Sequence, residues 1–145
     1  MTEGTTPAVV VDTMVVSSLI NAARHPKLAA EYSELIEARP VVVSFATITE
    51  LRYGAMKAGW GDLRRRALER DLERFVIVQP DDRLMTICAD LRATCEATAH
   101  PLGQKIHEAD RWIASTAIRL GIELISDDRV FDDVSPLRLR SRRQS

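Results

Sequence analysis

Short apolar runs without polar alternation recur along this chain, and they constrain its fold more than any other feature. Three are dominated by β-branched residues and a fourth is interrupted only by Glu123; the runs span residues 8–11, 41–43, 75–78 and 122–125. Strands buried on both faces of a parallel sheet have this continuous pattern, whereas strands with one solvent-exposed face alternate apolar and polar residues. The runs therefore predict parallel strands, and residues 137–139 are a candidate for a short fifth strand at an edge.

Segments with helical periodicity separate these runs. Residues 26–38 begin with a proline that suits a first helical turn. Apolar positions recur every three or four residues in the other segments, which span 47–57, 62–74, 82–100 and 109–120. Strands that alternate with helices form βαβ units. We predict an α/β fold with a central, mostly parallel sheet of four to five strands and helices on both faces.

The length and composition indicate one globular domain. At 145 residues the chain is close to the common size of a single domain, so we assign residues 1–140 to one domain and residues 141–145 to a basic tail. No apolar run approaches the roughly 20 residues that cross a bilayer, and the amino end lacks the basic segment of a secretory signal. We expect a cytoplasmic protein without membrane contact, in which Cys88 and Cys95 are reduced and pack within a helix.

The charge distribution favours a localised site over a uniformly charged surface. The net charge of −1 argues against a protein that coats nucleic acid non-specifically. Basic residues are nevertheless in excess in residues 51–75, and the last ten positions contain four arginines and no acid. This pattern suits an enzyme that gathers carboxylates in a site and keeps arginines nearby for a polyanion, although ordinary surface charge produces it too.

Acidic residues follow the predicted strands at the edge where a parallel sheet binds its ligands. Asp12 ends the first strand and Glu50 lies just past the second. Asp110 opens the helix that leads into the fourth strand, and Asp128 follows that strand. In open parallel sheets, ligands bind beyond the carboxyl ends of the strands. Clustered carboxylates repel one another unless a cation is bound, and ligands that are all oxygen favour Mg²⁺ or Mn²⁺ over zinc.

Each of these acids also has a purely structural explanation. Asp12 and Asp128 suit turns, Asp110 suits the N-cap of a helix, and Glu50 suits the first turn of a helix. For a single acid we favour the structural explanation. The coincidence of four acids at one edge favours a functional site.

Four segments in order resemble the signature segments of PIN-domain nucleases. They are VVVDT at residues 9–13, TITELRYG at 47–54, HEADRWIA at 107–114 and SDDRVF at 126–131. The short single-domain format is similar to the VapC toxins of bacterial toxin-antitoxin pairs. The resemblance implies a PIN-like three-layer fold.

The resemblance also implies a set of site residues. Asp12, Glu50, Asp110 and Asp128 match the acidic quartet of the family, with Asp12 and Asp110 as the foremost direct metal ligands, Asp128 as a further ligand and Glu50 able to act through a water. Thr13 and Ser126 match positions whose hydroxyls support the site, although the family commonly has threonine in place of Ser126. The spacing favours Asp128 over Asp127, which we expect to face solvent.

A metal-dependent endoribonuclease that uses Mg²⁺ or Mn²⁺ is the function that the resemblance implies. Its implied partners are an RNA substrate, a second copy of the chain in a homodimer, and a cognate antitoxin that lies along the toxin and blocks the site. Nothing in the composition or the spacing points to the antitoxin.

Arginines are the candidates for binding the rest of an RNA, because the carboxylates repel its phosphates. One group, Arg64 to Arg66, also suits a solvated helix face, which we favour for it. The other group suits a disordered, solubilising tail as well; it comprises Arg138, Arg140, Arg142 and Arg143. His107 lies one helical turn before Asp110, where it can support the site or contact a phosphate, but we favour a surface or cap position.

Three alternative functions stay open. A receiver-like phosphorylation domain is disfavoured because the strand at residues 41–43 leads into Ser44-Phe45-Ala46, without the phospho-accepting aspartate. A catalytically inactive PIN-like module for RNA binding or assembly is disfavoured because all four acids are present. A PIN nuclease of RNA maturation, outside any toxin pair, is the third.

Overall fold

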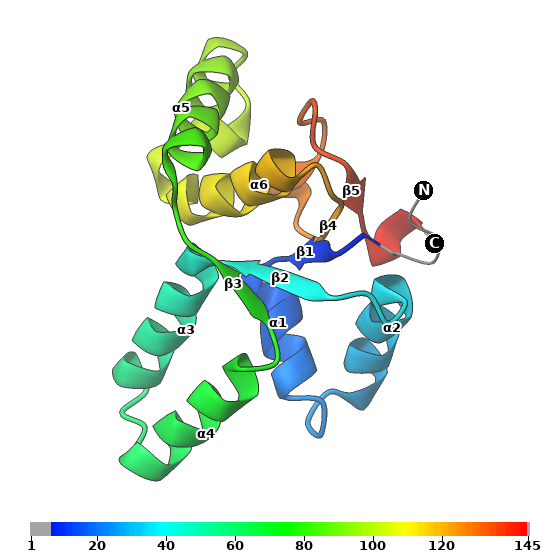
Figure 1. Cartoon of the computed structure of the whole chain (residues 1–145), viewed down its shortest axis with the longest axis vertical. Helices are drawn as coiled ribbons and strands as arrows, with labels where there is room; N and C mark the ends of the chain where they lie inside the picture. Colours follow the sequence, from blue (N-terminus) through cyan, green and yellow to red (C-terminus); the bar gives the residue numbers. More distant parts are fainter. Residues whose placement is uncertain (1–6, 145) are drawn as a thin grey trace.

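A computed structural model of the chain, in which residues 7–144 are described, contains a five-stranded sheet that is parallel throughout (Figure 1). The strands are β1 (Val9–Val11), β2 (Val41–Ser44), β3 (Val76–Val78), β4 (Leu124–Ile125) and β5 (Leu139–Arg140), and their order across the sheet is β3-β2-β1-β4-β5. Val10 of β1 lies opposite Val42 on one side and Leu124 on the other. The predicted α/β fold is confirmed, and β1 lies at its centre.

Six helices cover the two faces of this sheet, which gives three layers (Figure 1). They are α1 (Thr13–Ile20), α2 (Pro26–Ile36), α3 (Phe45–Lys57), α4 (Asp62–Leu72), α5 (Asp82–Ala97) and α6 (Glu108–Leu120). Short 3-10 turns join some of the elements: η1 (Pro101–Gly103), η2 (Lys105–His107), η3 (Arg129–Phe131) and η4 (Arg142–Gln144). In the part of the chain that the structure describes, no helix is long and apolar enough to cross a membrane.

Alternate residues of the strands enter two separate hydrophobic cores. Val9 and Val11 pack with α1 to α4 on one face, whereas Val10 packs with α5 and α6 on the other. The fully buried Tyr32 of α2 belongs to the first core and Phe131 belongs to the second. Burial on both sides of β1 explains its unbroken valine run.

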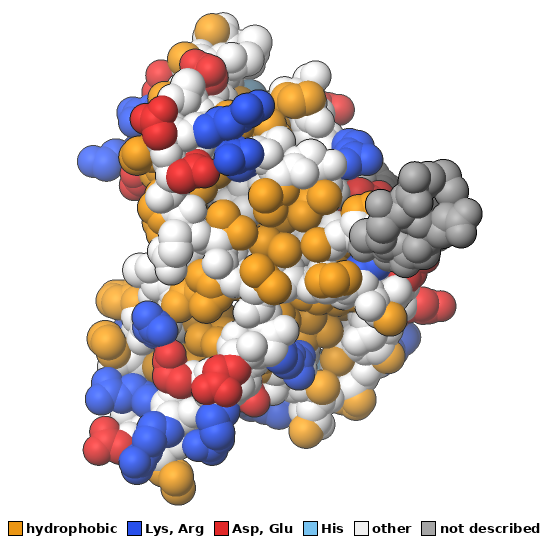
Figure 2. Space-filling model, in the orientation of Figure 1, with side chains coloured by type: hydrophobic (Ala, Val, Ile, Leu, Met, Phe, Trp, Pro, Cys, Tyr) orange, Lys and Arg blue, Asp and Glu red, His pale blue; other side chains and the backbone are white. Residues whose placement is uncertain are grey.

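The third strand differs from the prediction. Residues 75–78 predict a strand buried on both faces, but Val76 and Ile77 of β3 are 55% and 38% exposed. The reason is that β3 lies at an edge of the sheet and pairs only with β2. Figure 2 shows hydrophobic side chains at the surface across the middle of the face where β3 runs in Figure 1. Edge position depends on the order of strands, which the local sequence does not encode.

One helix was not predicted, and another begins two residues earlier than predicted. The helix α1 was not predicted, because its eight residues are too few to show a clear helical period. It is stabilised by the side chain of Asp12, which caps it, and by its own residues Val15 and Val16, which are buried on the sheet side of the helix. The helix α3 begins at Phe45 rather than Thr47, since the Ser44 hydroxyl accepts a hydrogen bond from the Ala46 amide at 3.1 Å.

The carboxyl-terminal residues are packed against the domain. Ser141 is 1% exposed, and η4 follows it directly. Within the predicted tail of residues 141–145, the described side chains of Ser141, Arg142 and Arg143 all contact the domain. Residue 145 and the amino-terminal residues 1–6 lie outside the described residues. Cys88 and Cys95 are buried, free thiols on α5, as predicted.

Candidate active site

The centre of the candidate site is Asp12, at the junction of β1 and α1. Its side chain is the N-cap of α1: Oδ1 accepts a hydrogen bond from the Val15 amide at 2.9 Å. Its other oxygen, Oδ2, accepts a hydrogen bond from the hydroxyl of Ser126, which directly follows β4. Since β1 and β4 are neighbours in the sheet, their carboxyl ends bring these two residues together. Asp12 is only 5% exposed.

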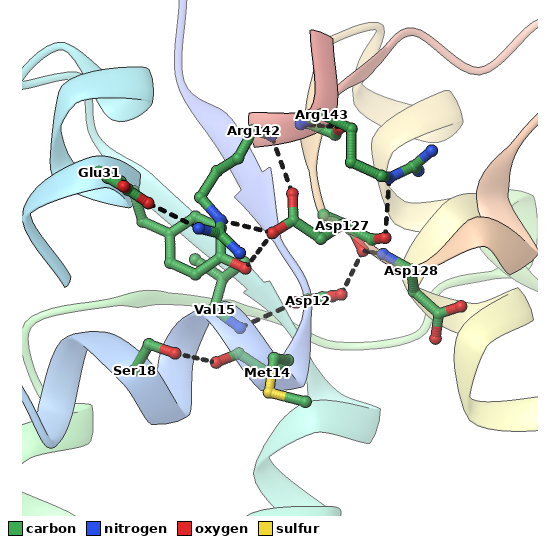
Figure 3. Close-up of polar contacts among 12 residues, drawn as sticks. Asp12, Met14, Val15, Ser18, Glu31, Asp127, Asp128, Arg142 and Arg143 are labelled. Atoms are coloured by element: carbon green, nitrogen blue, oxygen red, sulfur yellow. Dashed lines mark hydrogen bonds and ion pairs between the residues drawn. The ribbon is translucent and has the colours of Figure 1, made fainter. Parts of the chain in front are cut away.

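The Ser126 hydroxyl also connects Asp12 to Asp128 (Figure 3). The Asp128 amide donates to Ser126 Oγ at 3.0 Å, while Asp128 Oδ1 accepts from the Val130 amide at 2.9 Å and so caps η3. These bonds fix the backbone of Asp128 and leave its side chain exposed at the surface. Figure 3 shows the Asp128 carboxylate directed away from Asp127, whose side chain points to the opposite side of the loop.

The second strand contributes Glu50 through α3. Glu50 Oε1 accepts a hydrogen bond from the Thr13 hydroxyl at 3.1 Å. The hydroxyl of Thr47, one helical turn before Glu50, lies 3.1 Å from the same Thr13 oxygen. Thr47 is fully buried, so it holds Thr13, and through Thr13 it orients Glu50. The sequence prediction did not include Thr47, although it begins the TITELRYG segment.

The first turn of α6 contributes Asp110. Its Oδ2 lies 2.9 Å from Nδ1 of His107, which is the N-cap residue of the helix but makes no side-chain bond to the helix backbone. His107 thus orients a site carboxylate, which is the less favoured of the two positions considered for it from the sequence. Both side chains are partly exposed.

The carboxylates influence one another electrostatically. The pKa of Asp12 is raised to about 6, mainly because burial desolvates its carboxylate; the negative charges of Asp128 and Asp110 also contribute to the rise, and the bonds from Ser126 and Val15 oppose it. Burial also raises the pKa of Asp110, which His107 counteracts and Asp128 reinforces. The protein around Glu50 partly desolvates its carboxylate, and this together with the Asp110 charge raises its pKa in spite of the bond from Thr13. Asp12, Asp110 and Asp128 are therefore within electrostatic reach of one another, and Glu50 is within reach of Asp110.

The donor set suits a hard divalent cation. In residues 7–144, no three His, Cys, Asp or Glu side chains converge closely enough to enclose a metal ion. The acids that face one another nevertheless provide only oxygen ligands, as Mg²⁺ and Mn²⁺ prefer. A buried carboxylate with a raised pKa, flanked by other carboxylates, is stabilised in its charged form by a cation. Asp12, Asp110 and Asp128 are the residues that could hold one.

The neighbouring Asp127 was predicted to face solvent, but its side chain is bonded within the domain. Its Oδ2 accepts hydrogen bonds from the Tyr32 hydroxyl at 2.8 Å and from Arg142 Nε at 2.6 Å, and its Oδ1 accepts from the Arg142 amide at 2.8 Å (Figure 3). Burial opposes the charge of Asp127, but these bonds outweigh it and lower the pKa. Tyr32 is 95 residues away in sequence, so no local pattern could have identified this contact.

The carboxyl-terminal arginines proposed to bind RNA are engaged within the chain. Arg138 donates to the Gly121 carbonyl, Arg140 pairs with Glu37 at 3.1 Å, and Arg143 pairs with Asp132 at 3.0 Å. Arg142 pairs with Glu31 at 2.6 Å in addition to Asp127. Each of these four arginines therefore has a partner within the domain.

The arginines of α4 lie apart from the acids. Arg64 stacks over the ring of Trp60 with its guanidinium carbon 3.9 Å from the centroid, and Arg65 lies 3.6 Å from Asp62. Figure 2 shows basic side chains gathered over the α4 end of the molecule. Trp60 packs against the first core, and Trp112 stacks edge-on with Phe45 at 5.1 Å while remaining partly exposed.

Fold and site together define a small three-layer α/β domain with an acidic site at the carboxyl edge of its sheet. The family model described as the PIN domain matches residues 9–136, and the chain belongs to this family. Proteins of the family are typically nucleases and generally use divalent metals. A search of curated proteins finds no match.

Solved structures with the same fold cover nearly the whole chain. The VapBC2 structure from Rickettsia felis, bound to a DNA fragment of its promoter, contains a chain 24% identical with a TM-score of 0.76, and the match covers 93% of this chain and 98% of that one. VapBC-1 from nontypeable Haemophilus influenzae is 25% identical with a TM-score of 0.72 and the same coverage. DNA-bound VapBC from Salmonella typhimurium is 22% identical with a TM-score of 0.73, over 94% and 98% of the two chains.

Proposed function

We propose that this protein is a divalent-metal-dependent endoribonuclease that hydrolyses RNA phosphodiester bonds. The observation that supports this most directly is the buried carboxylate of Asp12, whose pKa is raised to about 6 and which faces the charges of Asp110 and Asp128. Such an arrangement is costly for the metal-free protein and favourable once a cation is bound. Membership of the PIN domain family supports the same function.

Each site residue has a distinct role in this proposal. Asp12 and Asp110 would hold Mg²⁺ or Mn²⁺ directly, with Asp128 as a further ligand and Glu50 acting through a water. When bound there, the cation would supply activation of water for in-line attack and stabilisation of charge on the phosphate and on the leaving oxygen. Thr13 orients Glu50, and Ser126 holds Asp12 and the backbone of Asp128. His107 orients Asp110.

We further propose that the protein is the toxin of a toxin-antitoxin pair, acts in the cytoplasm and forms a homodimer that a cognate antitoxin inhibits. The support is the likeness to chains of VapBC complexes, one of them 25% identical over nearly the full length. Expression of the chain alone, against co-expression with the product of an adjacent gene, tests this role: growth arrest that the second protein relieves is the expected result. Cleavage without growth arrest would indicate a nuclease of RNA maturation.

The nuclease proposal is tested by incubating the purified protein with total RNA, with and without Mg²⁺ or Mn²⁺, beside the Asp12→Asn variant. Discrete cuts that need both the metal and the wild-type residue are expected. If neither metal supports cleavage and calorimetry detects no binding of either ion, the protein is instead a catalytically inactive RNA-binding or assembly module.

A further inference from the structure

The β4–η3 loop, residues 126–128, is held from two opposite sides. On one side, Ser126 bonds to Asp12 and to the Asp128 amide. On the other side, the side chain of Asp127 is bound by the carboxyl-terminal segment (Figure 3). Neighbouring side chains of an extended backbone point in opposite directions. A displacement of Asp127 therefore displaces both of its neighbours, which belong to the acidic site.

Arg142 provides most of the second set of contacts. Its backbone amide and its Nε bind different oxygens of the Asp127 carboxylate, at 2.8 Å and 2.6 Å. Its Nη1 pairs with Glu31 of α2 at 2.6 Å, and its guanidinium lies over the ring of Tyr32 with 5.3 Å between the guanidinium carbon and the centroid. Planar guanidinium groups in such charge-assisted, stacked arrangements are rigid and specific. The segment thus connects the loop to α2.

Arg143 makes further contacts that hold the β4–η3 loop. Its Nε donates to the backbone carbonyl of Asp127 at 3.1 Å, and its amide donates to the hydroxyl of Ser141 at 2.9 Å. In addition, the Ser126 amide donates to the Arg140 carbonyl at 3.1 Å, which continues the pairing of β4 with β5. Both the main chain and the side chain of the loop are therefore attached to residues 140–143.

We propose that Arg142 is a positioning residue, which holds the β4–η3 loop so that Ser126 and Asp128 are in place for the divalent cation. The inference rests on the proposed metal site and assigns the segment after β5 to that site rather than to RNA binding. A loop that is ordered before the cation arrives leaves less conformational entropy to be lost on binding. Mutation of residues that hydrogen-bond to metal ligands typically changes metal affinity by about 10- to 100-fold. Arg142 acts one residue further out, through Asp127, so its effect is expected at the lower end of that range.

The first measurement is made on the metal-free protein, by amide hydrogen exchange of Arg142→Ala and wild type. The amides of Asp128 and Val130, which bond within the loop, are expected to exchange about tenfold faster in the variant. The β1 amides are expected to keep their rates. Arg92→Ala is the matched control, because it removes an arginine from an exposed pair with Glu96 on α5 and should change neither set.

The second measurement is a Mn²⁺ titration, followed by steady-state RNA cleavage. Arg142→Ala is expected to bind Mn²⁺ about tenfold more weakly, with a lower kcat and an unchanged KM for RNA. Unchanged exchange rates and Mn²⁺ affinity would overturn the proposal. A raised KM with a salt dependence weaker by about one counterion would instead make Arg142 a phosphate contact.

A milder variant covers the case in which Arg142→Ala does not fold. Glu31→Gln removes only the outer partner of Arg142, and smaller changes of the same sign in exchange and Mn²⁺ affinity are expected; no change in either would overturn the proposal. If wild type cuts no RNA, the proposed function fails, whereas exchange and Mn²⁺ binding still decide the role of Arg142.

Discussion

Asp12→Asn should stabilise the metal-free protein at neutral pH. The pKa of this buried carboxyl is about 6 in the folded protein and 3.8 in an unfolded chain. A difference of about two pKa units corresponds to about 3 kcal/mol, by which the ionised carboxylate lowers the free energy of unfolding above pH 6. The folded state binds this proton more tightly, so the cost is fully present above about pH 6 and disappears as the pH falls below about 4.

Asparagine retains the shape of the side chain and removes the charge. Its carbonyl can still accept from the Val15 amide, and its NH₂ group can donate to Ser126 Oγ. The expected gain in the free energy of unfolding is therefore up to about 3 kcal/mol at pH 7.5, which for a domain of this size raises Tm by roughly 6–12 °C. At pH 4 the gain should be close to zero.

Thermal unfolding of metal-free wild type and variant between pH 4 and pH 7.5, in chelator, measures this difference. Asp81→Asn is the matched control: Asp81 also caps a helix, with Oδ1 2.7 Å from the Leu84 amide, but that bond and Arg119 hold its pKa below the usual range. This control should not be stabilised at pH 7.5. A Tm of Asp12→Asn at or below that of wild type at pH 7.5, or a gain that does not vary with pH, would refute the reasoning.

Three further predictions concern the site and its support. Mn²⁺ should bind about tenfold more weakly at pH 5 than at pH 7.5, because a proton on Asp12 must then be displaced; calorimetry at both values checks this, and equal affinities would contradict it. Ser126→Ala should lower the free energy of unfolding by about 1–3 kcal/mol in urea, since it leaves Oδ2 of the buried Asp12 carboxylate without its donor while Oδ1 keeps the Val15 amide, whereas Ser126→Thr should retain most of the stability. Gly103→Ala should lower the free energy of unfolding in urea by about 1–3 kcal/mol, because a Cβ there would lie 2.8 Å from the Glu96 backbone nitrogen. Gly54→Ala, in open space on α3, is the control and should not lower it.

Much of this fold could be predicted from local sequence because its determinants are local. The valine runs encode burial, and Pro26, Asp81 and Gly121 mark helix ends. The position of β3 at an edge could not be predicted, because strand order depends on how all the units pack. The short helix α1 was missed for a different reason: its cap and its buried face stabilise it, and neither produces a long period.

The candidate site likewise contains residues that could be predicted from the sequence and contacts that could not. The four acids could be proposed together because the carboxyl ends of parallel strands share one edge of the sheet. The contacts that hold the loop beside Asp128 could not be predicted from the sequence, because Tyr32, Arg142 and Glu31 come from distant segments. Basic composition alone suggested a role in RNA binding for Arg142, whereas the structure places it in ion pairs with two carboxylates.

The contact between Asp12 and Ser126 spans 114 residues, which has a consequence for how the protein refolds. Helices and the neighbouring pair β1–β2 form over short loops, whereas β1 meets β4 only after a long loop closes, and contacts of large sequence separation form slowly. Far-ultraviolet circular dichroism should therefore recover before metal binding during refolding from urea. Until β1 pairs with β4, Asp12 and Ser126 are apart, so a chain that has formed its helices does not yet have the site.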